Sequence, residues 1–287
     1  MLLAVISALG SALLYALASV LQQRAAAAQP REQSMRLGLL TRLMRRPVWL
    51  VGIGADGAAY VLQFVALGHG ALALVQPLLV SGLLFALPLG AFLARTRMSG
   101  RDWSGAIALV VGLSLFLLVS SPGAGHANAS NMTWLMLSII CALAIGLIVL
   151  AAQGRSSRLR AGLLAAAAGV DYGLTAAYTK SAAHLLLDHG VVAAITSWEA
   201  YGLVIAGVLG MLLAQSAFQS GPLDASLPVL TVMDPIVSIV IGAAVLGEGI
   251  RTGLGATTLE LAGLALMTVG VFVLSRAEDA AVNRQAA

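Results

Sequence analysis

Charged residues are scarce in this chain. Asp, Glu, Lys and Arg make up 10% of its 287 residues, whereas a soluble domain carries about 25%. Hydrophobic residues make up 60%, and the mean hydropathy is +0.95. So little charge cannot cover a surface exposed to water. The composition therefore excludes a soluble enzyme, a disordered tail and a nucleic-acid binder, despite a pI near 9.7, and leaves a polytopic membrane protein.

Cysteine and aromatic residues are also few. The one cysteine, Cys141, cannot form an intramolecular disulfide, and its apolar surroundings favour a core side chain. Aromatic residues make up 5%, and the aromatic girdles and period-2 pattern of an outer-membrane barrel are absent from the sequence. The 31 glycines and many alanines suit helices that pack closely in a membrane.

Long apolar runs dominate the chain, each near the length of about 20 residues that crosses a bilayer as a helix. They predict an all-α polytopic membrane protein with nine transmembrane helices, at residues 2–22, 48–68, 71–94, 103–120, 132–152, 161–186, 191–214, 222–246 and 254–275. The least secure boundary is Gly68-His69-Gly70, where a tight turn must close a helical hairpin.

Basic residues gather on alternate connections. Fourteen of the 16 Lys and Arg residues fall on one side of the predicted membrane, and only Arg251 lies on the other. Basic connections stay in the cytoplasm, so we expect the N-terminus outside and the C-terminus inside, in a plasma membrane of bacterial inner-membrane type. The arginines are expected to contact anionic lipid headgroups, and no nucleic acid.

The sequence also matches itself at a long offset. The matched pairs are Tyr15–Tyr172 and Leu17–Leu174 at an offset of 157, and Pro77–Pro235, Gly105–Gly263 and Gly112–Gly270 at 158. The matched spans are five apart, an odd number, so the second copy is inverted, as is typical of transporters. We expect a first half at 1–122, a connector span with its loops at 123–157, an inverted half at 158–276 and a short cytoplasmic tail at 277–287. Pro77 could pair with Pro228 instead, so the register stays open.

Polar residues within the spans are the functional candidates, because the bilayer core strongly penalises ionisable groups. Asp56 lies near the middle of the second span, and Tyr60 and Gln63 follow on the same helix face. The sixth span repeats this spacing. The predicted pathway residues are Asp56, Tyr60, Gln63, Asp171, Thr175, Tyr178, Lys180, Glu199 and Asp234. The alternative is that these carboxyl groups only form packing hydrogen bonds between helices.

Lys180 is the only lysine in the chain and lies inside the sixth span. It is nine residues from Asp171 and so nearly opposite on the helix, which excludes a simple intrahelical ion pair. Lys180 would either offset another carboxylate or bind an anionic group. A buried lysine can also lose its proton, which an arginine cannot readily do. The alternative is that it extends toward the outer interface.

Prolines suggest broken helices in two spans. Asp234 precedes Pro235 in the eighth span, Pro228 lies seven residues earlier, and Pro77 is the counterpart in the third span. A helix broken at these positions would expose carbonyl groups that could coordinate a cation, whereas a mere kink would not. Glu199, counted from the start of the seventh span, would mirror the depth of Asp56.

Four local patterns carry a family resemblance. They are Leu21-Gln22-Gln23-Arg24 at the end of the first span, Trp49 to Gln63 followed by Ala73-Leu74-Val75-Gln76-Pro77-Leu78, Thr175 to Lys180, and Leu227-Pro228-Val229 with Glu248 twenty residues later. The chain resembles the drug/metabolite transporter superfamily, with its EamA-type carriers, and most closely its nine-span branch of NIPA-type magnesium transporters. It departs from the family at Arg95 and Arg97, which stand where a glutamate is common.

The resemblance implies a secondary transporter that moves a small, cationic solute or a metabolite by alternating access, with Mg²⁺ as one candidate. Asp56, Asp171 and Asp234 are then the candidate metal ligands, because Mg²⁺ needs only one or two carboxylates. No Walker sequence is present, so we expect neither ATP drive nor a cofactor, and no enzymatic activity. Self-association into a homodimer is compatible with this view. The rival class is a non-transporting membrane scaffold or a lipid-handling protein.

Overall fold

The computed structural model describes residues 1–27, 45–94, 100–120, 125–126, 129–220, 223–249 and 254–285, and every regular element within them is a helix. The elements are α1 (Leu2–Ala27), α3 (Pro47–His69), α4 (Leu72–Val80), α5 (Gly82–Ala94), α6 (Gly100–Ser120), α7 (Asn131–Ala152), α8 (Ser157–Thr196), α9 (Trp198–Ser220), α10 (Leu223–Ala244) and α11 (Leu254–Gln285). The all-helical part of the prediction is confirmed.

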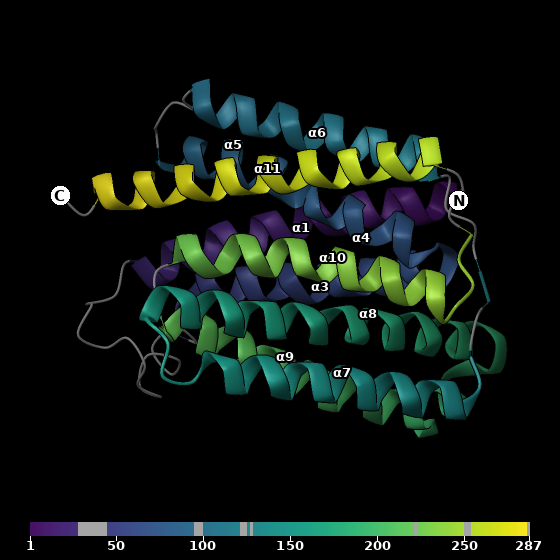
Figure 1. Cartoon of the computed structure of the whole chain (residues 1–287). Helices are drawn as coiled ribbons and strands as arrows, with labels where there is room; N and C mark the ends of the chain where they lie inside the picture. Colours follow the sequence, from purple (N-terminus) through teal and green to yellow (C-terminus); the bar gives the residue numbers. More distant parts are fainter. Residues whose placement is uncertain are drawn as a thin grey trace.

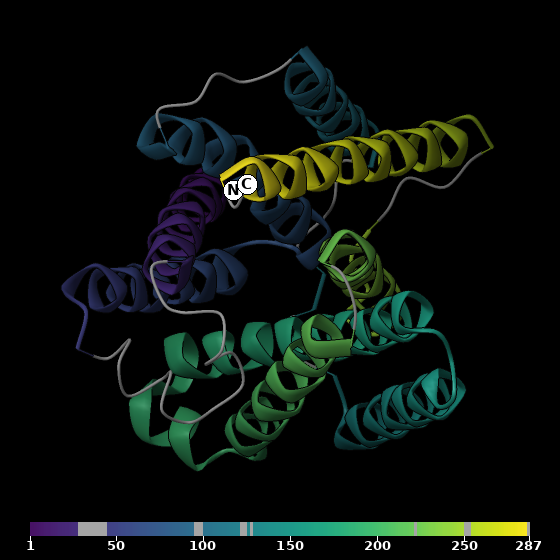
Figure 2. The same cartoon turned by 90° about the vertical axis from the view of Figure 1, so that its left-hand side faces the viewer.

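The helices lie side by side as a bundle (Figure 1). The chain enters α1 at one end of the bundle and leaves α11 at the opposite end. Helix α1 packs on α3, α4 and α5, while α8 packs on α7, α9 and α10. These two groups meet where α4 contacts α10 and α3 contacts α8. Seen end-on, α6 and α11 lie at one edge and α7 and α9 at the other (Figure 2).

Several helices are long and apolar enough to cross a membrane. Among the described residues, five helical segments pass by length and composition, or six if the bent pair of α8 and α9 counts as one span. Their outward faces carry large apolar side chains; Leu147 and Val204, for example, are 67% and 65% exposed. A surface of this kind is stable only against lipid. The basic segments at 28–44 and 95–99, with Arg251, lie outside the described residues.

The predicted third span is two helices in the structure. Pro77 lies within α4, and the break comes four residues later at Ser81, whose N–H and hydroxyl both donate to the Leu78 carbonyl. Helix α5 then starts at Gly82, where the α1 backbone approaches so closely that a Cβ atom would lie 3.1 Å from the Ala12 oxygen. The break thus lets the chain pass tightly over α1.

The break predicted in the eighth span is wrong. Helix α10 continues from Leu223 to Ala244 through both Pro228 and Pro235. A proline removes one backbone donor, but a helix packed against neighbours can absorb that loss as a local adjustment without ending.

The boundary between the predicted sixth and seventh spans also needs correction. Helix α8 continues past residue 186 to Thr196 and has one non-helical residue, Gly190, with φ 82°. Helix α9 then starts at Trp198, at an angle of 70° to α8. The apolar run 191–196 forms the last part of α8 and not the start of the next helix. Gly190, with its positive φ, bends the chain just before this run. Glu199 is therefore the second residue of α9 and does not lie at mid-span.

Helices α6 and α11 pack through glycines on both sides. A Cβ atom at Gly112 would lie 2.6 Å from the Gly263 oxygen, and one at Gly270 would lie 2.9 Å from the Gly105 oxygen. Contacts this short bring the two backbones together without side chains between them. As residue numbers rise along α6, their partners fall along α11, so the two helices are antiparallel.

Replacing Gly112 with alanine is expected to lower the free energy of unfolding by about 1–3 kcal/mol, the usual cost of overpacking. The new Cβ atom would lie 2.5 Å from the Met267 nitrogen, so the helices must move apart. Denaturant titration in detergent measures the change. Gly146→Ala in α7 is the matched control, because no atom lies within 4 Å of its Cβ position. Equal stability of the two variants would contradict this packing.

Candidate functional site

A buried ion pair joins α8 to the segment that follows α10. Lys180 Nζ lies 2.6 Å from Glu248 Oε1, and the two side chains are 1% and 0% exposed. Glu248 also accepts the first two N–H groups of α4, from Leu72 to Oε1 at 2.7 Å and from Ala73 to Oε2 at 3.0 Å. The carboxylate therefore neutralises the lysine and caps the positive end of a helix.

The backbone around Glu248 is shaped to hold it in place. Helix α10 ends at Ala244, Gly247 adopts φ 61°, and the Glu248 N–H donates to the Gly242 carbonyl at 2.9 Å. A Cβ atom at Gly242 would collide with Glu248 Oε2. Gly125, with φ 64°, lies against the Leu246 carbonyl from the other side. Gly242 and Gly125 thus make room for Glu248, and Gly247 forms the turn that precedes it.

A second group of polar residues gathers near the middles of four helices. Tyr15 and Tyr172 each interact electrostatically with both Asp56 and Asp234, and Tyr15 also with Tyr60. We call this group the Tyr–Asp cluster; its members are Tyr15 of α1, Asp56 and Tyr60 of α3, Tyr172 of α8 and Asp234 of α10. Three of these residues were predicted for the pathway. The two carboxylates come from helices far apart in the sequence.

Hydrogen bonds tie the Tyr–Asp cluster to its surroundings. Tyr15 donates to Gln63 Oε1 at 2.7 Å, and the Tyr60 hydroxyl lies 3.3 Å from Thr179 Oγ1. Ser238 donates to Asp234 at 3.2 Å. Asp56 is exposed. Hydroxyl groups, an amide oxygen and two carboxylates therefore share one region of an otherwise apolar bundle.

Asp171 also interacts electrostatically with Tyr172 of the Tyr–Asp cluster, and its carboxylate lies against α9. It is 1% exposed, packs against Gly210 of α9, and its Oδ2 has no hydrogen bond among the described residues. Thr175, predicted to share its face, donates to the Asp171 backbone carbonyl at 2.9 Å. A buried carboxyl oxygen without a donor is costly in a structural role, so its place in a pathway stays a prediction.

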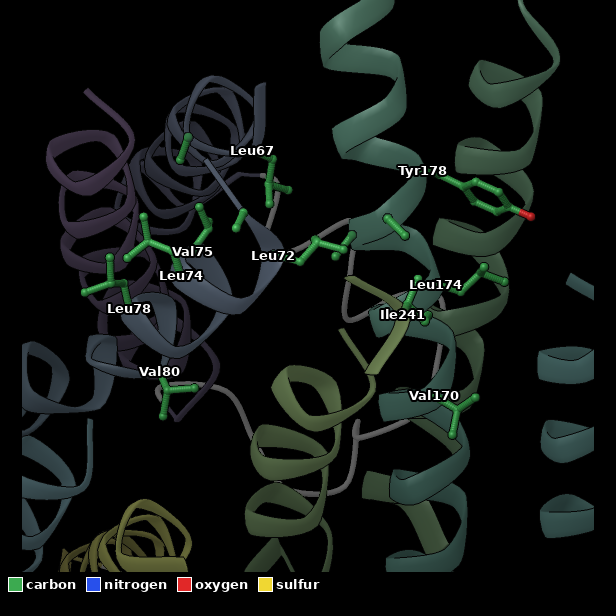
Figure 3. Packing of buried hydrophobic residues seen from close by; sticks show 14 of the residues in the cluster. Leu67, Leu72, Leu74, Val75, Leu78, Val80, Val170, Leu174, Tyr178 and Ile241 are labelled. Atoms are coloured by element: carbon green, nitrogen blue, oxygen red, sulfur yellow. The ribbon is translucent and has the colours of Figure 1, made fainter. Parts of the chain in front are cut away.

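Tyr178 belongs to an aromatic cluster between α7, α8 and α9. Its ring centroid is 5.3 Å from that of Trp134 and 5.8 Å from that of Trp198, and its hydroxyl bonds to Ser138. Figure 3 shows Tyr178 and Leu72 on opposite sides of α8. Glu199, next to Trp198, is 4% exposed. Tyr178 therefore packs between helices, and its place in a pathway stays a prediction.

The three candidate metal ligands are not assembled into one site. Among the described residues, no three His, Cys, Asp or Glu side chains are close enough to hold a metal ion together. Asp171 lies against α9, whereas Asp56 and Asp234 face Tyr15. The three carboxylates therefore do not form one site together, and which of them binds a metal stays a prediction. The cause is the direction of Asp171 on α8, which spacing within one helix cannot determine.

Glu248 is the buried partner of Lys180 that the sequence analysis did not identify. It lies in one of the family patterns, two residues beyond the predicted eighth span. Two features of the sequence point to this pairing. Glu248 follows Gly247 directly, and Lys180, the one lysine within a span, needs a negative partner. A pair 68 residues apart in sequence is not visible from helix periodicity.

These features define a multi-pass α-helical membrane protein with one buried ion pair and a second, partly exposed group of polar residues. The chain is 33% identical over 275 residues to an uncharacterised protein of Corynebacterium glutamicum, a match that covers 96% of this chain and 95% of the relative. It belongs to the family of that protein. No protein-family model and no solved structure matches the chain.

Proposed function

We propose that this protein is a secondary transporter of the drug/metabolite transporter type, which moves a small cationic solute by alternating access. The Tyr–Asp cluster carries the proposal. Two carboxylates, one from α3 and one from α10, lie near the same two tyrosines in the middle of an apolar bundle. A membrane protein keeps ionisable groups there chiefly along substrate or ion pathways.

The proposed architecture is two inverted halves, residues 1–122 and 158–276, joined by α7. The glycine contacts support it. At an offset of 158, Gly105 corresponds to Gly263 and Gly112 corresponds to Gly270. The contact of Gly105 with Gly270 therefore has an equivalent contact of Gly263 with Gly112, and both contacts occur. The packing of α1 on α3 and α5 likewise has its counterpart in that of α8 on α9 and α10. A pair of contacts exchanged by one offset is the signature of a pseudo-two-fold axis.

Tyr15 and Tyr172 are equivalent in this scheme. They occupy matched positions of the two halves and both interact with Asp56 and Asp234. The matched tyrosines support a place for the Tyr–Asp cluster near the proposed pseudo-symmetry axis, where inverted-repeat transporters bind substrate. We further propose nine spans, with α4 and α5 together as the third, and a plasma-membrane orientation with the basic connections in the cytoplasm.

The charge balance favours a cation. Lys180 is neutralised by Glu248, so it does not offset Asp56 or Asp234. A site with two carboxylates, tyrosine hydroxyls and aromatic rings suits either a partly hydrated Mg²⁺ or a small organic ammonium ion. A metabolite with a cationic group satisfies the same chemistry.

Uptake into proteoliposomes tests the function. The purified protein is reconstituted and offered Mg²⁺, small amines and small carboxylates, each with and without a pH gradient. We expect a cation to enter faster than it enters protein-free liposomes, and carboxylates to enter no faster. If a folded preparation moves none of these solutes, the proposal fails and the rival class, a scaffold or lipid-handling protein, takes its place.

A further inference from the structure

We propose that Lys180, Glu248 and the N-terminus of α4 form a gate that closes one end of the transport pathway. This inference rests on the proposed function. The gate is defined by four groups: Lys180 Nζ, the Glu248 carboxylate and the N–H groups of Leu72 and Ala73. It opens when Glu248 separates from α4, and the pathway then reaches the end of the bundle at which α4 starts.

The gate joins the two proposed halves through a single carboxylate. Helix α4 belongs to the first half, while Lys180 and Glu248 belong to the second. Lys180 is eight residues beyond Tyr172 on α8, or about 12 Å along the helix axis. Ten further residues separate it from Gly190, where α8 bends. The gate therefore lies between the Tyr–Asp cluster and the end of the bundle that holds the α3–α4 turn (Figure 1).

Complete burial makes this contact a closed state. Leu72 and Ala73 are 0% exposed, and so is the Glu248 side chain. At this contact, these groups leave no accessible surface between α4 and α8. An access route on this side requires the contact to break.

The chemistry of the contact suits a reversible closure. A buried ion pair contributes little net stability relative to its separated, hydrated ions, because desolvation offsets most of the attraction. All four groups regain hydrogen bonds with water when they separate. An apolar contact of the same size would lose free energy on opening without this compensation. Glu248 also lies between Gly247 and Gly249, and glycine can adopt more backbone conformations than other residues.

The glycine at 242 offers a way to open the gate without changing any charge. A Cβ atom at this position would collide with Glu248 Oε2. Gly242→Ala therefore displaces the carboxylate from α4, while Lys180 and Glu248 both remain. Glu248→Gln instead keeps the shape of the side chain and removes its charge.

Cysteine accessibility tests the gate. The reporter is Gln76→Cys in a Cys141→Ala background. Gln76 is 2% exposed and lies one helical turn after Leu72 in α4, just behind the gate. A membrane-impermeant maleimide is added to intact cells and, separately, to inside-out vesicles. We expect Glu248→Gln and Gly242→Ala to speed labelling about ten-fold or more, from one side of the membrane only.

Glu260→Gln is the matched control, because Glu260 is a buried glutamate of α11, 7% exposed and outside the gate. It should leave labelling at the rate of the reporter alone. Unchanged labelling in both gate variants, in protein that elutes as a folded species, overturns the gate. Uptake is measured on the same preparations. Absent transport in the reporter protein counts against the proposed function. Unchanged labelling of the gate variants counts against the gate.

A charge reversal tests whether the gate depends on the N-terminus of α4 or only on the ion pair between residues 180 and 248. Lys180→Glu with Glu248→Lys restores opposite charges but places an ammonium group against the N–H groups of Leu72 and Ala73. A helix N-terminus repels a cation. We expect the double variant to label as fast as Glu248→Gln, and labelling as slow as that of the reporter alone would contradict the part assigned to α4.

Discussion

Replacing Glu248 with leucine is expected to lower the free energy of unfolding by about 3–5 kcal/mol, the cost of removing one partner of a buried ion pair. The substitution takes away the carboxylate that lies 2.6 Å from Lys180 and also leaves the Leu72 and Ala73 N–H groups without their acceptor. Denaturant titration of the purified protein in detergent measures the change.

The companion variant combines Lys180→Met with Glu248→Leu. An apolar pair of similar volume removes both buried charges, and such replacements are often neutral relative to the intact pair. We therefore expect the double variant to be more stable than Glu248→Leu alone, with the remaining loss due to the uncapped α4 helix. A double variant as unstable as the sum of its two single variants would show that the two side chains do not interact in solution.

Replacing Asp56 or Asp234 with asparagine is expected to lower cation flux about 100-fold or more. A unit charge about 4 Å from a cation contributes about 4 kcal/mol at an effective dielectric constant near 20, and asparagine keeps the shape of the side chain without that charge. Both residues interact with Tyr15 and Tyr172, so either loss should weaken the same site. Initial uptake rates in proteoliposomes provide the measurement.

The control for this prediction is Glu260→Gln, which makes the same chemical change at a carboxyl group outside the Tyr–Asp cluster. Its uptake should match that of the unmodified protein. If Asp56→Asn and Asp234→Asn also transport at the unmodified rate while remaining folded, the Tyr–Asp cluster is only a packing feature. A loss in one variant alone would mean that the two carboxylates do not share a site.

The sequence predicts the helical class well because most of the helices are long and apolar. The pair Gly105 and Gly112 on one side, and Gly263 and Gly270 on the other, was found from spacing alone, and the structure places them in contact across α6 and α11. Close packing of membrane helices requires small residues at regular positions, so this feature can be recognised from each helix's own sequence.

Boundaries and partners were harder to predict, for two physical reasons. The apolar run 191–196 gave no sign that Gly190 bends the chain, so Glu199 was placed several residues too deep in its helix. Lys180 and Glu248 are 68 residues apart, and helix periodicity says nothing about which helix faces another. For Asp171, spacing along α8 predicts which residues share its helix face, but it does not predict that Gly210 of α9 is the neighbour of that face.

The most direct test of alternating access is labelling of a cysteine at Tyr15, within the Tyr–Asp cluster, by an impermeant maleimide from each side of the membrane. Two inverted halves that alternate around the Tyr–Asp cluster should expose this position to both sides in turn, so labelling is expected both in intact cells and in inside-out vesicles. It should proceed while the membrane stays impermeable to the reagent. Labelling from neither side, or from one side under every condition, would contradict the account.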